Sequence, residues 1–340
     1  MGYRVHLSPS GHEFIAEPQE TLLEAALRSG INIYYNCSNG SCGECRARII
    51  AGRGEEREFH DYVLTEAERN NGVVLLCTTH AVSDLVLEAR VAGTPSEIPH
   101  QQITAKIINV EQLSGSVVML LLRTPRTRSL RFMAGQHVEL HTAGHSVDLP
   151  IASCPCNGML LQFHLLQGRD EPLASWLLEQ PRVGDNIRIE GPYGNFILNE
   201  ESEHDVVMVS EATGFASIKS LIEHYINLEK PQPLYLYRFA YDEQGNYLGN
   251  LCESWRDALD NFYYTPLVVP SHTAMLAQLQ RIAEQISNPA QTDIYLVISE
   301  EISAAAQAAF ARRGVPAQQI AVEHHRTVLR NEPLPDAASR

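Results

Sequence analysis

Three cysteines lie close together near the start of the chain, and a fourth follows later. Residues 37–45 read Cys-Ser-Asn-Gly-Ser-Cys-Gly-Glu-Cys, which leaves four residues between the first two thiols and two between the next pair. Cys77 follows in the segment Leu-Leu-Cys-Thr-Thr. Gly40 and Gly43 stand between the thiols, where a loop must wrap tightly and where residues without a Cβ do so at least steric cost. Any fold for this chain must gather four thiols in one small volume.

This spacing predicts that Cys37, Cys42, Cys45 and Cys77 hold a [2Fe-2S] cluster. Two irons bridged by two sulfides require four further soft, anionic ligands, which cysteine thiolates supply. A zinc site usually shows two short knuckles of Cys or His, whereas here a lone cysteine replaces the second knuckle. A disulfide framework is typical of small secreted chains. We therefore favour the [2Fe-2S] cluster over both alternatives.

Length and charge limit the other function classes. A chain of 340 residues exceeds one comfortable core and predicts two or three domains. The net charge of −15 argues against binding to nucleic acid or anionic lipid, and suits docking to a redox partner protein with a basic patch. The opening Met-Gly-Tyr-Arg-Val-His-Leu has no apolar secretory core, and no apolar run is long enough to span a bilayer. We expect a cytoplasmic protein.

Residues 1–93 show the pattern of a small mixed domain. Strands are expected at 3–7, 13–16, 45–52, 73–77 and 84–88, and a short helix at 18–30. This order, with a cysteine loop after the helix and a late fourth thiol, resembles a plant-type ferredoxin domain, which has a β-grasp fold. Residues 94–102 are rich in proline and polar residues and are interpreted as a linker.

Short strand-like runs separated by turn residues predict a small antiparallel β-barrel over residues 103–200. The expected strands are 104–110, 117–122, 137–141, 160–165 and 186–189. Phe132-Met-Ala-Gly-Gln136 resembles the Pro-Gly-Gln stretch of ferredoxin-reductase-type flavin domains. Gly191-Pro-Tyr-Gly-Asn-Phe196 resembles the turn that ends those domains.

Strands and helices alternate over residues 203–330, which predicts a doubly wound parallel α/β half. Expected strands are 205–210, 234–239, 263–269 and 293–298, and expected helices are 213–225, 254–259, 274–286 and 304–313. Thr213, Gly214 and Phe215 form the turn after the first strand, which would be the NAD-like binding turn of such a half. The tail at 331–340 is expected to be unstructured.

The three domains in this order resemble the iron-sulfur flavoprotein reductases that serve bacterial oxygenases, and the glucoseen reductases of deoxysugar pathways. The resemblance implies that a hydride passes from NAD(P)H to FAD and that single electrons leave through the [2Fe-2S] cluster. A flavin is needed because nicotinamide gives two electrons while the cluster takes one.

The flavin motif departs from the family's pattern. The family carries Arg-x-Tyr-Ser before an Ile-Ala-Ser stretch, where the Arg holds phosphate and the Tyr and Ser contact the flavin. Here Val147, Leu149 and Pro150 take those three places, and Asp148 adds a negative charge. The change removes a bidentate phosphate ligand and a backbone donor, which puts FAD binding in doubt.

The nicotinamide motifs depart as well. The family's Gly-Gly-Thr-Gly-Phe-Ala-Pro turn reads Glu211-Ala-Thr-Gly-Phe-Ala-Ser217, which brings a carboxylate to the place of a pyrophosphate. The Cys-Gly-x-Pro signature is replaced by Val297-Ile-Ser-Glu300, and the aromatic residue that stacks on the flavin has no clear match near 321–325. NAD(P)H binding is therefore also in doubt.

Three functions follow from this pattern. The first is electron transfer through the [2Fe-2S] cluster to a redox partner such as an oxygenase, with electrons supplied by a separate reductase. The second is an NAD(P)H-dependent oxidoreductase with a non-standard flavin site. The third is a redox-sensing or assembly subunit without turnover. The catalytic residues, the acceptor and the donor are not identified by the sequence.

Smaller groups of residues have ordinary interpretations beside functional ones. His137 and His141 are able to share a strand face and bind a metal, although surface histidines are far more common. Cys154 and Cys156 form a candidate reactive pair with no basic neighbour in sequence. Lys219 follows the NAD-like turn, where a solvated helix face is the commoner outcome.

Overall fold

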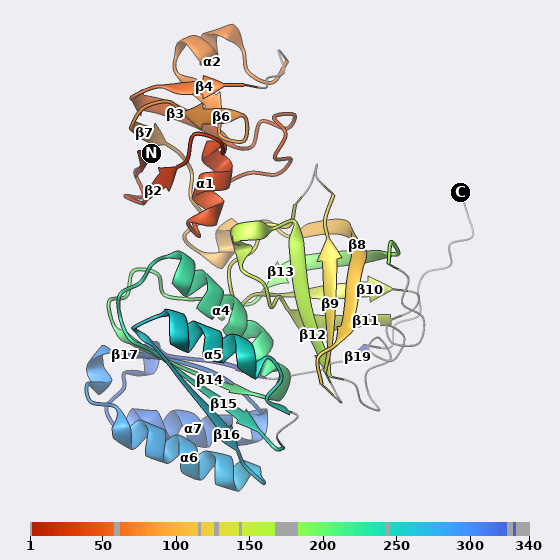
Figure 1. The fold of residues 1–340 in the computed structure, drawn as a ribbon, viewed down its shortest axis with the longest axis vertical. Coiled ribbons are helices and arrows are strands. Elements are labelled where there is room, and N and C mark those ends of the chain that lie inside the picture. The colour runs from red at the N-terminus through yellow and green to blue at the C-terminus, as the bar shows by residue number, and fades with distance from the viewer. Residues whose placement is uncertain are drawn as a thin grey trace.

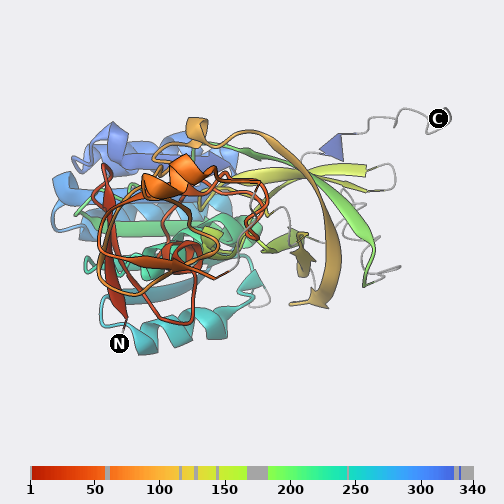
Figure 2. The same cartoon turned by 90° about the horizontal axis from the view of Figure 1, so that it is seen from above.

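The computed structural model describes residues 2–57, 62–114, 117–125, 129–142, 145–166, 183–242, 245–324 and 329–330. Three regions follow one another along the chain, and each has its own sheet (Figure 1). Seen from above, the first region overlies the third, while the second extends to one side (Figure 2). The order of folds predicted from the sequence, a β-grasp domain, an antiparallel barrel and a parallel α/β half, is confirmed.

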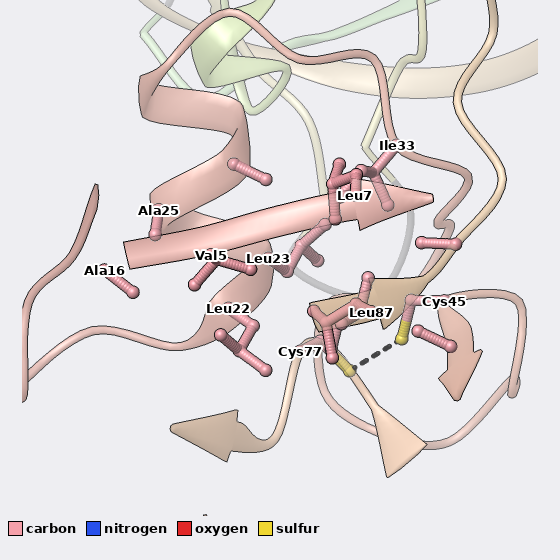
Figure 3. Close-up of a cluster of buried hydrophobic side chains, with 14 of the residues drawn as sticks. Val5, Leu7, Ala16, Leu22, Leu23, Ala25, Ile33, Cys45, Cys77 and Leu87 are labelled. Carbon is pink, nitrogen blue, oxygen red and sulfur yellow. Dashed lines mark hydrogen bonds between the residues drawn. The ribbon is translucent and has the colours of Figure 1, made fainter. Parts of the chain in front are cut away.

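The first region is a β-grasp domain built around helix α1 (Leu22–Arg28). Its elements are β1 (Tyr3–Ser8), β2 (Glu13–Ala16), β3 (Arg46–Ala51), β4 (Gly54–Glu56), α2 (Glu66–Asn70), β5 (Val73–Leu75), β6 (Thr79–Ala81) and β7 (Leu85–Glu88). The main sheet has the order β2-β1-β7-β3-β5, with β1 and β7 parallel, and β4 pairs with β6 separately. Figure 3 shows how α1 and β1 enclose the apolar side chains between them.

Helix α1 begins later than the sequence pattern suggests. The expected helix starts at Pro18, but the observed N-cap is Thr21. The Thr21 hydroxyl accepts a hydrogen bond from the Glu24 backbone N–H, and the Glu24 carboxylate accepts one from the Thr21 N–H. This reciprocal capping box fixes the start of the helix because it satisfies two otherwise unpaired donors.

The second region is a nearly closed antiparallel barrel. Its strands are β8 (Gln101–Gln112), β9 (Val117–Arg123), β10 (His137–Thr142), β11 (His145–Pro150), β12 (Leu160–Leu166) and β13 (Asn186–Tyr193). They have the order β12-β9-β8-β13-β10-β11, and β19 (Leu329–Arg330) pairs with β11. Strand β11 is not expected from the sequence, and β8 begins at Gln101, inside the expected linker. A short 3₁₀ turn, η1 (Pro95–Glu97), lies in that linker.

The third region is a parallel sheet with helices on both faces. Its elements are β14 (Asp205–Glu211), η3 (Ala212–Gly214), α4 (Phe215–Asn227), β15 (Leu234–Ala240), α5 (Gly249–Ala258), β16 (Phe262–Val268), α6 (His272–Gln285), β17 (Thr292–Ile298), α7 (Glu300–Arg312) and β18 (Ile320–His324). The order β16-β15-β14-β17-β18 places the reversal of winding between β14 and β17. Ligands of such sheets bind outside the carboxyl ends of the strands at this point.

Two differences from the sequence expectation concern this region. Helix α5 begins at Gly249, five residues before the expected Ser254. Strand β18 was not expected, because its half-buried residues show no clear apolar alternation. The expected tail at 331–340 lies outside the described residues. Among the helices that the structure describes, none combines the length and the apolar composition needed to cross a bilayer.

Candidate metal centre and the strand-end network

The four predicted cluster cysteines converge in the first region. Cys45 directly precedes β3 and Cys77 lies between β5 and β6, and their sulfur atoms are 3.3 Å apart (Figure 3). Cys37 and Cys42 belong to the cysteine loop, residues 37–45, and the Cys42 N–H donates to the Cys37 sulfur at 3.3 Å. A side-chain hydrogen bond also links Cys37 with Cys42, so the four sulfurs form two close pairs. Two thiolates for each of two irons is the ligand arrangement that a [2Fe-2S] cluster requires.

Backbone N–H groups of the cysteine loop point at these sulfurs. Gly40 N–H donates to the Cys77 sulfur at 3.2 Å, and Glu44 N–H donates to the Cys42 sulfur at 3.4 Å. The loop reaches this shape because Gly40 and Gly43 adopt φ values of +80° and +75°. Such left-handed conformations are unfavourable for residues with a Cβ. The glycines in the motif thus allow the donors to face sulfur.

The local environment shifts the pKa values of the cysteine thiols in different directions. Burial opposes ionisation of Cys37, but hydrogen bonds from the Asn39 backbone, Ser41 and Cys42 lower its pKa to about 6. The hydrogen bond from Cys77 lowers the pKa of Cys45, and the same contact raises the pKa of Cys77. Hydrogen-bond donors that stabilise thiolate sulfur in a buried site favour the binding of soft metal ions, which prefer thiolate ligands.

The cysteine loop is accessible from one side. Cys37, Cys45 and Cys77 are buried, Cys42 is half-buried, and the loop exposes Ser38, Asn39, Ser41 and Glu44 to solvent. The donor set, the paired geometry and the thiolate-directed N–H groups all fit a [2Fe-2S] cluster. When bound, such a cluster would supply one-electron transfer chemistry, and the exposed residues of the loop would lie next to its ligands in the chain.

The segment that leads into the cysteine loop meets the barrel, and Arg131 of the barrel also interacts electrostatically with Glu44 and Cys42. The guanidinium carbons of Arg90 and Arg131 lie 4.5 and 5.1 Å from the centre of the Tyr34 ring. Ser129 N–H donates to the Asn36 carbonyl at 3.4 Å. The cation–π contact of Arg131 and the backbone hydrogen bond of Ser129 therefore hold the segment before the loop against the barrel, while Arg90 contacts Tyr34 within the first region.

The positions that correspond to the family's flavin motif do not present ligands for a phosphate. Val147 and Leu149 are buried in the barrel core, opposite Leu140 and Val138 of β10. Asp148 lies opposite Glu139 on the other face of the same strand pair. With apolar side chains inside and carboxylates outside, this segment offers no cation to a pyrophosphate. These residues do not fit FAD in the family's manner.

The NAD-like turn is closely packed. Thr213 and Gly214 are buried, and Phe215 is fully buried with the guanidinium carbon of Arg238 3.7 Å from its ring centre. A Cβ on Gly214 would approach the Val297 side chain to 2.7 Å. The glycine here therefore permits close packing of the turn on β17. The three residues remain a predicted nucleotide contact, and nothing in their packing presents them to a ligand.

Glu211 occupies the centre of the carboxyl edge of this sheet. Its carboxylate accepts hydrogen bonds from the Tyr241 hydroxyl at 2.5 Å and from the Ser299 N–H at 2.7 Å. His272 Nε2 lies 3.2 Å from the same carboxylate. We call Glu211, Tyr241, His272 and Ser299 the strand-end network. They follow or end strands β14, β15, β16 and β17 respectively, so they meet where a dinucleotide would bind.

This network changes the chemistry of the strand ends. Glu211 is 4% exposed, and burial alone would raise its pKa. The hydrogen bonds from Tyr241 and Ser299 outweigh burial and lower the pKa of Glu211, so the carboxylate is ionised. An anion already receives the Ser299 N–H, and a pyrophosphate would meet like charge. The strand-end network does not fit NAD(P)H. Glu211 stands out in the sequence as a carboxylate in the NAD-like turn, but no local pattern marks its three partners.

Lys219 joins the third region to the barrel. The sequence favoured a solvated helix face, and this was wrong because the side chain is 5% exposed. Its ammonium donates to the Ala152 carbonyl at 3.0 Å and to Glu223 at 2.5 Å. Glu223 in turn accepts from the Cys154 N–H at 3.0 Å. Lys219 therefore has a structural role between α4 and the barrel.

Comparison with known proteins agrees with the cysteine geometry. Residues 5–82 match the family described as the 2Fe-2S iron-sulfur cluster binding domain. The CDP-6-deoxy-L-threo-D-glycero-4-hexulose-3-dehydrase reductase of Yersinia pestis is 29% identical over 268 residues, covering 79% of this chain and 80% of that protein. The toluate 1,2-dioxygenase electron transfer component of Pseudomonas putida is 29% identical over 290 residues, covering 83% and 85%.

Solved structures share the fold across nearly the whole chain. The Amycolatopsis cytochrome P450 reductase superposes with a TM-score of 0.58 at 22% identity and covers 95% of this chain and 98% of its own. The ferredoxin reductase in carbazole 1,9a-dioxygenase gives 0.58 at 19% identity, with the same coverage. The resemblance predicted from the sequence is confirmed: residues 5–82 match an iron-sulfur cluster binding domain, and most of the chain is similar to proteins named as reductase or electron transfer components.

Proposed function

We propose that this chain is an electron-transfer protein that passes single electrons through a [2Fe-2S] cluster held by Cys37, Cys42, Cys45 and Cys77 to a redox partner such as an oxygenase. The observation that supports it is the pairing of four sulfurs, with Cys45 and Cys77 3.3 Å apart and backbone N–H groups directed at sulfur. Clusters of this ligation have potentials near about −400 mV, low enough to reduce such a partner.

Exposed residues of the cysteine loop give a partner a place to dock. Ser38 and Ser41 are exposed and lie next to the half-buried Cys42 in the chain. Tyr34 contacts Arg131 of the barrel, and this contact helps to hold the domain there. The net charge of −15 favours a partner with a basic docking face. Encounter with such a partner should slow as salt is added.

The supply of electrons is proposed to be external. The barrel offers no phosphate ligand at Val147 and Leu149, and Glu211 receives the donor that a nucleotide pyrophosphate would need. The relatives in the comparisons are named as reductase or electron transfer components, and the docking of an oxygenase is carried over from them. In this chain we assign the barrel and the α/β half to holding the cluster domain and docking the donor.

Anaerobic purification followed by denaturation tests both statements. We expect iron and labile sulfide at two atoms of each per chain, and no FAD in the supernatant. Neither NADH nor NADPH should bleach the visible absorption of the intact protein, while dithionite should. Stoichiometric FAD together with bleaching by NAD(P)H would show that the chain is instead an NAD(P)H-dependent reductase with a non-standard flavin site.

A further inference from the structure

The outer face of strands β10 and β13 carries three ligand-type side chains outside the proposed electron path. Along β10, Val138 and Leu140 point into the barrel core and are fully buried, so Glu139 and His141 point outward. The strand register places Glu139 directly opposite Glu190 of β13. Two carboxylates facing each other across antiparallel strands destabilise the pairing unless a positive charge lies between them.

The ligand atoms of this group point at one another. His141 Nε2 lies 3.7 Å from a carboxylate oxygen of Glu139 and 3.8 Å from one of Glu190, and all three atoms lie within 4.8 Å of one another. A point equidistant from atoms so placed lies between about 1.9 and about 2.4 Å from each, a range that includes the bond lengths of about 2.0–2.2 Å from Zn²⁺ to nitrogen and oxygen ligands. The group therefore has room for one ion.

Neighbouring side chains orient the three ligands. The other oxygen of Glu190 accepts from Gln102 Nε2 at 2.9 Å and lies 3.4 Å from Arg188 Nε, which leaves the second oxygen for His141. His141 Nε2 is buried and has no hydrogen-bond partner among the described residues. A buried imidazole nitrogen left without a hydrogen bond loses solvation that a metal ion would restore. Carboxylates already held by hydrogen bonds are typical of metal sites.

We propose that Glu139, His141 and Glu190 bind one divalent first-row cation, with Zn²⁺ and Mn²⁺ as the chemical class. One imidazole and two carboxylates are ligands that these ions accept, whereas the soft thiolates of the cysteine loop select iron-sulfur clusters. The ion cancels the repulsion between Glu139 and Glu190 and ties β10 to β13. Three protein ligands leave at least one coordination position for water or a small anion.

His137, on the same strand face, is separate from this site. Its ring stacks on Tyr193 with the ring centres 5.8 Å apart, and its Nδ1 lies 3.8 Å from Glu323. The sequence pattern alone pairs His137 with His141 as candidate metal ligands. The structure pairs His141 with two glutamates from two strands instead. His137→Ala is therefore a matched control that removes a histidine from the same strand and leaves the three ligands in place.

Titration of the cluster-loaded protein with Mn²⁺ tests the proposal. Mn²⁺ is the probe because it is a hard ion that binds thiols weakly. The decrease in the EPR signal of free Mn²⁺ measures the number of Mn²⁺ ions bound per chain. The oxidised [2Fe-2S] form is used because it has no EPR signal of its own. We expect one Mn²⁺ per wild-type chain, with affinity at least about tenfold weaker in His141→Ala and in Glu190→Gln. Zn²⁺ should displace the bound Mn²⁺ and raise the Tm of the wild type but not of His141→Ala.

The control and the fold checks make each outcome decisive. His137→Ala should bind Mn²⁺ as the wild type does, and all variants should keep the visible absorption of the cluster. Equal affinity of the wild type and His141→Ala, or no binding by a folded wild type, would overturn the site. If His141→Ala misfolds, the conservative Glu139→Gln decides in its place.

Discussion

The cysteine loop and the strand-end network are both built to hold negative charge, but they hold different things. In the cysteine loop, backbone N–H groups point at sulfurs that the rest of the chain leaves for an inorganic ligand. In the strand-end network, the Ser299 N–H and the Tyr241 hydroxyl point at Glu211, which belongs to the protein. The first region keeps its donors for a cofactor, whereas the third satisfies its donors internally. The same kinds of hydrogen-bond donor therefore face sulfur in one region and a carboxylate of the protein in the other.

The largest effect should come from the cysteine loop. Cys42→Ser removes one of the two ligands of an iron, so we expect complete loss of iron, of visible absorption and of electron transfer to a dye acceptor. The matched control is Cys156→Ser, which changes a half-buried thiol outside the loop and should keep the full spectrum. A red, iron-loaded Cys42→Ser protein would show that the ligand set is different.

A substitution in the strand-end network should lower the free energy of unfolding. Glu211→Ala leaves the Ser299 N–H and the Tyr241 hydroxyl without their acceptor, which should cost about 3 kcal/mol of unfolding free energy. The visible spectrum should be unchanged, because the cysteines lie in another region. Glu301→Ala is the control, since its carboxylate also contacts His272 but is 79% exposed, and it should cost less than about 0.5 kcal/mol. Unfolding monitored by circular dichroism in urea gives both values.

Glu323, a second buried carboxylate of the third region, should make the stability of the protein depend on pH. Burial raises the pKa of Glu323 to about 7, although a hydrogen bond from Ser217 opposes the shift. In the folded state this group keeps its proton longer than in the unfolded chain, so its contribution to stability is present below pH 4.5 and is lost as pH rises to about 7.

Glu323→Gln cannot ionise and keeps the shape of the side chain. The difference in stability between this variant and the wild type should therefore grow between pH 5 and 8, reaching about 2 kcal/mol in favour of the variant. Urea unfolding at a series of pH values measures it. A difference that is flat across this range would mean that Glu323 titrates as it does in the unfolded chain.

The smallest expected effect lies in the helix beside the cysteine loop. Thr21→Ala removes the hydroxyl that caps α1 and should lower stability by about 1 kcal/mol. Cluster content should stay constant, because α1 supplies no ligand. Loss of iron in Thr21→Ala at a temperature where the protein is folded would show that α1 and the cysteine loop are coupled more tightly than their contacts indicate.

The cysteine site could be predicted because most of the residues that define it lie close together in the sequence. Three ligands and two glycines fall within residues 37–45, and the chemistry of iron leaves few other uses for that spacing. The Thr21–Glu24 capping pattern was equally local and would have corrected the start of α1. The alternation of strands and helices predicted the parallel sheet for the same reason.

What could not be predicted depends on contacts between distant segments. Glu211 was visible, but its partners come from three other strand ends, and only the order β16-β15-β14-β17 brings them together. Lys219 was misjudged because the carbonyl it binds belongs to the barrel. Strand β11 was missed because His145-Ser-Val-Asp-Leu-Pro150 ends in proline and mixes polar with apolar residues. The pairing of Glu139 with Glu190 needs the register of β10 and β13.

Two of the four cysteines belong to the hydrophobic core and two lie on a loop, and this difference affects how the cluster is inserted. Cys45 and Cys77 belong to the buried core of the β-grasp domain, so the folding of that core places them before any inorganic group arrives. Cys37 and Cys42 lie on the loop, whose glycines adopt left-handed conformations. We expect the empty chain to fold around half of its ligands and the loop to close last. Insertion of iron and sulfide would then require only the cysteine loop to open, while the barrel and the α/β half stay folded.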